Sequence, residues 1–151
     1  MKKLIILDDV FDASTIAEIA GFDYGEGEKW YELGANPIHE RILDLCARHF
    51  DLGAIVGYEM WRNSGNPGWH VDKDERLFRE RKEYRYPQCS AVYYADVGEV
   101  SAGQFFTDDL RYFPRTNRLV MFSPGLYHGV SAFSGRRFAV SLNPWNHRIT
   151  S

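Results

Sequence analysis

The sequence predicts a mainly β domain with supporting helices at its N-terminal end, and two observations lead to this fold class. The apolar residues of the N-terminal third recur with helical spacing, whereas from residue 55 onward they fall in short runs separated by glycine- and proline-containing turns. Several short strands in succession are typical of an antiparallel sandwich or barrel. The 151 residues suit a single domain, in which we expect residues 1–54 to form a helical support region and residues 55–145 to form the β core.

The N-terminal region is expected to begin with one short strand and one helix. Residues 4–7 are apolar and are followed by two aspartates, which is typical of a short buried strand. Asp12 or Ser14 can cap a helix that ends at Gly21, and residues 25–34 are expected to form a loop.

A second helix is expected to open at Asn36 and Pro37, because asparagine is favoured as an N-cap and proline at the first helical position. One face of this helix carries Ile38, Ile42, Leu45, Cys46 and His49. The β core is expected to hold strands at residues 55–62, 88–95, 103–107, 118–123, 127–133 and 137–143. The charged run from Asp72 to Arg85 is predicted to be a solvated loop or a short helix.

Charge and cysteine content argue against several classes of protein. The formal net charge of −3 provides no basic field for nucleic acid. Cys46 and Cys89 are the only cysteines and form neither a disulfide framework nor a zinc motif, so both are expected to be reduced core residues. The first apolar run is too short for a signal peptide and no stretch approaches the length of a membrane span, so the expected location is the cytoplasm.

Three side chains of the β core are of the types that bind iron. His70 and Asp72 lie two residues apart, so on a strand they would point to the same side. His128 follows a Pro-Gly turn on a later predicted strand and can face them. Two histidines and one carboxylate form the facial triad of non-haem iron(II) oxygenases, which leaves the opposite face of the metal open for substrate and oxygen. A His-x-Asp pair also occurs by chance, so the prediction depends on a second feature.

That second feature is Arg137. On the predicted strand at residues 137–143, Arg137 shares a face with Ala139 and Ser141, and Arg136 points the other way. A guanidinium among small inward residues is costly to bury unless it meets a carboxylate, and a planar, two-pronged pair is the natural solution. A structural salt bridge at the strand edge is the alternative for Arg137, and it is the role expected for Arg136.

Together these features resemble the 2-oxoglutarate/Fe(II) oxygenase superfamily, specifically its prolyl-hydroxylase-like branch. The resemblance covers about residues 56–145 and depends on the order and spacing of His70–Asp72, Ser90–Tyr94, Gly103–Phe106, Arg118–Phe122 and His128–Phe138. It implies a double-stranded β-helix, a jelly-roll or cupin-like fold, with N-terminal helices in support. It also implies a reaction in which iron(II), 2-oxoglutarate and dioxygen hydroxylate an unactivated C–H bond and release succinate and carbon dioxide.

The resemblance also implies roles for residues of the cofactor pocket. The arginine that pairs with the far carboxylate of 2-oxoglutarate sits where Arg137 does, Tyr94 matches a tyrosine that often assists it, and Val92 shares the face of Tyr94. Many relatives carry another tyrosine on the strand before His-x-Asp. Tyr58 and Met60 share a face of that strand here, and both are candidates for lining the pocket.

The substrate is less specified. The resemblance indicates a prolyl or other peptidyl residue, and a free amino acid or small metabolite is the alternative; mild acidity disfavours a nucleic-acid demethylase. Trp61, Arg62 and Trp69 are candidate substrate contacts, although packing is the better interpretation of the two tryptophans. Two other classes compete: a cupin-like metalloprotein that ignores 2-oxoglutarate, and a jelly-roll binding module without catalysis. The complete triad argues against the second, and Arg137 tests the first.

Overall fold

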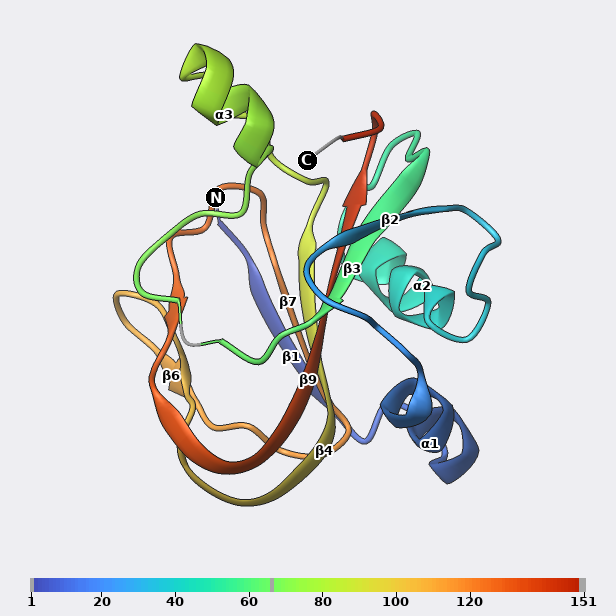
Figure 1. Ribbon diagram of the computed structural model, residues 1–151, viewed down its shortest axis with the longest axis vertical. Helices are drawn as coiled ribbons and strands as arrows, with labels where there is room; N and C mark the ends of the chain where they lie inside the picture. Colours follow the sequence, from blue (N-terminus) through green and yellow to red (C-terminus); the bar gives the residue numbers. More distant parts are fainter. Residues whose placement is uncertain (1, 66, 150–151) are drawn as a thin grey trace.

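The computed structural model describes residues 2–65 and 67–149, and a six-stranded antiparallel sheet forms its centre. In order across the sheet, the strands are β1 (Leu4–Asp8), β7 (Arg118–Phe122), β4 (Ser90–Ala102), β9 (Phe133–Trp145), β3 (Gly57–Arg62) and β2 (Lys29–Glu32). A second sheet contains β6 (Arg111–Tyr112), β5 (Phe105–Phe106) and β8 (Gly129–Val130). The long strands β4 and β9 curve away from the main sheet at one end, where their pairing has two register shifts (Figure 1).

Two of the three helices pack beside the main sheet, and the third projects from the molecule (Figure 1). Helix α1 (Ala13–Gly21) starts as predicted at Asp12, whose Oδ1 accepts a hydrogen bond from the Thr15 amide at 2.9 Å. Helix α3 (Glu75–Arg81) lies in the charged run, where a loop or short helix was predicted. Within residues 2–65 and 67–149, the structure contains no helix with the length and apolar character needed to cross a membrane.

Helix α2 (Glu40–His49) begins later than predicted. Asn36 and Pro37 precede it in a turn, in which the Asn36 carbonyl accepts a hydrogen bond from the Glu40 amide at 2.9 Å. The Glu40 carboxylate reaches back to the amides of Gly34 and Asn36, at 2.8 and 2.9 Å. These bonds hold the turn in place ahead of the helix, so Asn36 initiates the turn and is not the N-cap.

The alternation of side chains along the central strands separates two apolar clusters. The cluster on the helix side includes Tyr58, Met60, Ala91, Tyr93, Val140, Leu142, Ile42 and both cysteines. The cluster on the other side is smaller and consists of Val92, Tyr94, Phe105, Val120, Phe122 and Ala139. The predicted division of β9 is confirmed, because Ala139 lies in one cluster while Val140 and Leu142 lie in the other. Both cysteines are buried and free, also as predicted.

The N-terminal region contains both predicted helices and one strand more than predicted. Strand β1 was expected, but residues 29–32 form β2 inside the segment predicted to be a loop, and both strands extend the main sheet at its edges. Strand β6 was not predicted, and the strand expected at residues 127–133 is reduced to β8 and the first residue of β9. These elements are short edge pairings, which carry little hydrophobic periodicity of their own.

Candidate metal and cofactor site

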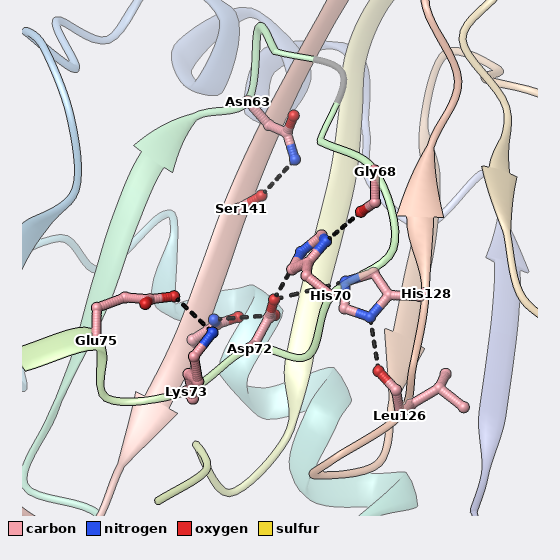
Figure 2. Close-up of polar contacts among 10 residues, drawn as sticks. Asn63, Gly68, His70, Asp72, Lys73, Glu75, Leu126, His128 and Ser141 are labelled. Atoms are coloured by element: carbon pink, nitrogen blue, oxygen red, sulfur yellow. Dashed lines mark hydrogen bonds and ion pairs between the residues drawn. The ribbon is translucent and has the colours of Figure 1, made fainter. Parts of the chain in front are cut away.

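The loop after β3 meets the segment before β8 at a pair of histidines. His70 and His128 form an antiparallel bridge, with amide-to-carbonyl distances of 2.8 and 3.0 Å. Asp72 lies beyond this bridge in a loop rather than on a regular strand, but its side chain still points to the same place (Figure 2). The Nε2 atoms of His70 and His128 lie 3.3 and 3.5 Å from Asp72 Oδ1. One ligand atom from each residue falls within 4.8 Å of the other two, so the structure brings the three predicted residues together.

Hydrogen bonds from the main chain and from Asn143 orient the three side chains. His70 Nδ1 lies 2.8 Å from the Gly68 carbonyl oxygen, and His128 Nδ1 lies 2.7 Å from that of Leu126. Since a carbonyl only accepts, each Nδ1 carries a proton, so in the neutral imidazole, the form that binds metal, each Nε2 directs a lone pair at the cluster. Asn143 Nδ2 donates to Asp72 Oδ2 at 3.2 Å, which fixes the carboxylate.

The electrostatics of the cluster also suit a cation. Burial acts to raise the pKa of Asp72, but hydrogen bonds from His128 and His70 outweigh it and hold that pKa well below its usual range. Burial acts to lower the pKa of His70, and its contacts with Asp72 and the Gly68 carbonyl outweigh this effect and raise the pKa. The lowered pKa of Asp72 favours its ionised form, which suits this carboxylate to bind a divalent cation.

The cluster opens into a cavity of about 860 Å³, which all three residues line. Behind it, the Phe105 and Phe122 rings pack on the His128 imidazole at centroid distances of 5.3 and 4.5 Å. Ligand atoms on one side and an open cavity on the other match the needs of a metal that must also bind small molecules. The donor set therefore fits iron(II).

Arg137 and Tyr94 are buried next to this cavity with unused hydrogen-bonding groups. Arg137 is 5% exposed, and its Nη1 donates to the Asn63 carbonyl at 2.8 Å. Arg137 Nε and Nη2 and the Tyr94 hydroxyl have no hydrogen-bond partner in the described part of the chain. The guanidinium lies 5.4 Å from the centroid of the Tyr94 ring, and no carboxylate among the described residues forms an ion pair with it. Exposed Arg136 lies 3.5 Å from Asp96, the structural role predicted for it.

Asn63 lies between the cavity and Arg137. Val92, Ser141 and Asn63 line the cavity, whereas Arg137 and Tyr94 do not. Asn63 Nδ2 donates to Ser141 Oγ at 2.9 Å (Figure 2), and the main-chain carbonyl of Asn63 accepts the bond from Arg137. The unpaired donors of Arg137 and Tyr94 fit the far carboxylate of 2-oxoglutarate. Asn63 must move aside for this carboxylate to reach them from the cavity.

Two of the five residues predicted to line the pocket or contact substrate lie in the cavity wall. Trp61 and Arg62 line the cavity. Tyr58 and Met60 do not line the cavity, so their prediction as pocket residues is wrong. They face the helix-side cluster, and the alternate residues of β3, Glu59 and Trp61, face the cavity instead. Trp69 is 44% exposed and packs against Tyr127 and Phe106, with ring centroids 4.8 and 4.7 Å away, as the packing interpretation predicted.

Glu59 and Asn143 line the cavity and were not recognised from the sequence. The signal for Asn143 was present, since it continues the face of Arg137 and Ser141 along β9. The signal for Glu59 would have been a charged residue in an otherwise apolar strand.

No protein-family model and no curated protein sequence matches the chain. A prolyl-4-hydroxylase from Pseudomonas putida superposes with a TM-score of 0.64 and 18% identity, over 96% of this chain and 93% of that one. A viral collagen prolyl hydroxylase from Paramecium bursaria Chlorella virus-1, in complex with 2-oxoglutarate, gives 0.63 and 11% identity, over 93% of each chain. A 2-oxoglutarate–Fe(II) oxygenase-family oxidoreductase from Burkholderia pseudomallei gives 0.59 and 17%, over 97% and 86%. The chain therefore has the jelly-roll fold that these prolyl hydroxylases and oxygenases share, as its sequence predicted.

Proposed function

We propose that the protein is an iron(II)- and 2-oxoglutarate-dependent oxygenase that hydroxylates an unactivated C–H bond. The observation that carries this proposal is the pairing of a three-ligand cluster with a buried arginine that has no carboxylate partner. The cluster alone would also suit a cupin-like metalloprotein. A desolvated guanidinium with unused donors adds the need for a carboxylate from outside the chain.

Each residue of the site has a defined part in this proposal. His70, Asp72 and His128 bind the iron, and the Gly68 and Leu126 carbonyls keep the two imidazoles in the tautomer that binds metal. Iron(II) and 2-oxoglutarate, when bound, supply the oxidising chemistry that uses dioxygen and releases succinate and carbon dioxide.

The protein's own residues would bind 2-oxoglutarate and exclude water from the metal ligands. Arg137 and Tyr94 bind the far carboxylate, and Val92 forms the apolar wall beside them. Phe105 and Phe122 keep water from the back of His128. One structural neighbour, a prolyl hydroxylase from Trichoplax adhaerens of 15% identity and TM-score 0.54, is in complex with a peptide fragment. A prolyl or peptidyl residue is therefore one substrate class for this chain, and a free amino acid is the other.

The deciding experiment is an anaerobic titration of the iron(II) protein with 2-oxoglutarate, followed by the metal-to-ligand charge-transfer absorbance. The band is expected for the parent protein and for Arg136→Ala, and is expected to be lost in His128→Ala. Succinate release in air would then report turnover. Metal binding without the band would identify a cupin-like metalloprotein, and failure to bind metal would identify a binding module.

A further inference from the structure

One end of the cavity contains a carboxyl group that none of the roles above uses. Glu59 lies on β3 between two cavity-lining residues of the neighbouring strands: its register partners are Trp30 on β2 and Asn143 on β9. Asn143 in turn holds the Asp72 carboxylate. Glu59 is thus one strand away from the residue that positions a metal ligand, and it lines the same cavity as the three metal ligands.

Glu59 is not paired with a cation in the part of the chain that the structure describes. Its Oε1 accepts a hydrogen bond from the Trp145 indole at 2.9 Å, and no cationic side chain among the described residues forms an ion pair with it. Three cations that line the cavity pair with other carboxylates: Lys73 with Glu75 at 3.2 Å, Arg76 with Glu80 at 3.0 Å and Arg148 with Glu32 at 3.5 Å.

Other negatively charged side chains lie around Glu59 and raise the cost of ionising it. Burial raises the pKa of Glu59 to about 8; the bond from Trp145 opposes this shift, and the nearby carboxylates of Glu28, Asp72 and Asp74 reinforce it. A positive charge bound at this end of the cavity would therefore stabilise the ionised form of Glu59.

Asn143 supplies an independent sign that a donor is missing. The side chain is 3% exposed, and its amide nitrogen must face Asp72, because an ionised carboxylate only accepts. Asn143 Oδ1 is consequently left buried without a hydrogen-bond partner in the described part of the chain. A buried carbonyl without a donor is costly, so Asn143 Oδ1 is an acceptor that lacks an N–H donor, and Glu59, its register partner, adds a carboxyl whose Oε1 has only the Trp145 indole as donor.

The walls beside these acceptors are aromatic. Trp61 lies two residues from Glu59 on the same face of β3 and lines the cavity. The Trp30 ring lies over Gly57, where an added Cβ would come within 2.4 Å of it, and also lines the cavity. Indole faces beside a carboxylate favour an organic cation over a neutral or anionic group.

We propose that Glu59 and Asn143 bind a positively charged nitrogen of the substrate, so that the substrate is a small amine such as a free amino acid. The assignment of this amine as the substrate rests on the proposed oxygenase function, whereas its binding does not. A prolyl residue inside a peptide is a poorer match, because its amide nitrogen carries neither charge nor proton. The alternative role for Glu59 is structural, as the acceptor for Trp145, and glutamine would serve that role equally well.

The test is isothermal titration calorimetry with matched pairs of probes. Putrescine, L-proline and L-lysine are each compared with the fully N-acetylated form, in the zinc(II)- and 2-oxoglutarate-loaded protein and in the protein without either. At least one amine is expected to bind tenfold or more tightly than its acetylated partner. Glu59→Gln is expected to weaken that amine by roughly ten- to a hundredfold, the range for a hydrogen bond to a charged group.

Glu26→Gln is the matched control, because Glu26 is exposed in the same acidic segment as Glu28 and does not line the cavity. It is expected to bind the amine like the parent protein. The proposal is overturned if no amine binds more tightly than its acetylated partner, or if folded Glu59→Gln retains the parent's affinity. The comparison of probe pairs in the parent protein decides the question even if Glu59→Gln does not fold. Loss of amine binding only in the loaded form would instead count against the cofactor assignment.

Discussion

Replacing Arg137 with methionine is expected to make the ligand-free protein more stable while it destroys 2-oxoglutarate binding. The guanidinium is 5% exposed and makes a single hydrogen bond, to the Asn63 carbonyl, whereas Nε and Nη2 have none. Each unsatisfied buried donor costs about 1–3 kcal/mol, and the one bond lost with the side chain is worth about 1–3 kcal/mol. The net gain is on the order of 1–2 kcal/mol, in line with the replacement of other buried, poorly paired charges by apolar residues.

These magnitudes predict opposite changes in two melting temperatures. For a domain of this size, 1 kcal/mol corresponds to about 2–4 °C, so the ligand-free Arg137→Met protein is expected to melt about 2–8 °C higher than the parent. With 2-oxoglutarate at about a hundred times its dissociation constant, the parent gains about 2.7 kcal/mol. The variant gains less than about 1 kcal/mol, because loss of one side of a desolvated charge pair weakens binding by roughly thirtyfold to several-thousandfold.

The assay is differential scanning fluorimetry of the zinc(II)-loaded protein with and without 2-oxoglutarate. Arg136→Ala is the control and is expected to follow the parent, since that side chain is exposed and its only ion pair is a surface one. Arg137→Lys is expected to restore the 2-oxoglutarate shift only in part, because an ammonium cannot make a planar, two-pronged contact. The reasoning fails if Arg137→Met melts lower than the parent in the absence of ligand and still responds to 2-oxoglutarate.

Three further predictions concern the metal ligands, the thiols and Glu59. His128→Ala is expected to lose most of the iron measured by elemental analysis, and parent binding is expected to weaken at acid pH, since protons compete with the metal for its ligands; equal loading of parent and variant would contradict the ligand assignment. Cys46→Ala combined with Cys89→Ala is expected to retain turnover in the succinate assay, because both thiols are buried in the helix-side cluster away from the cavity; a folded but inactive double variant would refute this. The raised pKa of Glu59, about 8, favours its protonated form in the folded protein. The free energy of unfolding that Glu59 contributes is therefore fully present below about pH 4.5 and is lost as pH rises through about 8. Urea denaturation at pH 5 and pH 9 should show that Glu59→Gln removes a loss on the order of 1–3 kcal/mol, and an unchanged pH difference would count against the assignment.

Much of the site could be predicted because its residues follow rules that a single strand obeys. Arg137 and Ser141 share a face of β9 by simple alternation. Ser141 lines the cavity, and Arg137 is hydrogen-bonded to the cavity-lining residue Asn63. His70 and Asp72 converge for a different reason than the predicted one, since only His70 pairs with a neighbouring strand segment. The residue types and spacing were sufficient even though the local geometry was not a regular strand.

The phase of β3 could not be predicted because that strand is packed on both faces. Tyr58 and Met60 are buried against the helix-side cluster, while Glu59 and Trp61 face the cavity. Large side chains on both sides remove the alternation of apolar and polar residues from which a register is normally assigned. The edge strand β2, which supplies Trp30, was missed because its pairing with β3 is a long-range contact that leaves no local periodicity.

The bridge between His70 and His128 makes the metal site independent of the metal for its assembly. Both ligands belong to segments far apart in sequence, yet their own amides and carbonyls are hydrogen-bonded to each other, so the main chain fastens them together before any ion arrives. Stripping the ion with a chelator should therefore leave the scaffold folded, in contrast to small zinc domains that collapse without their metal. Replacing either imidazole also leaves these main-chain hydrogen bonds in place, so such variants change metal coordination without unfolding the site.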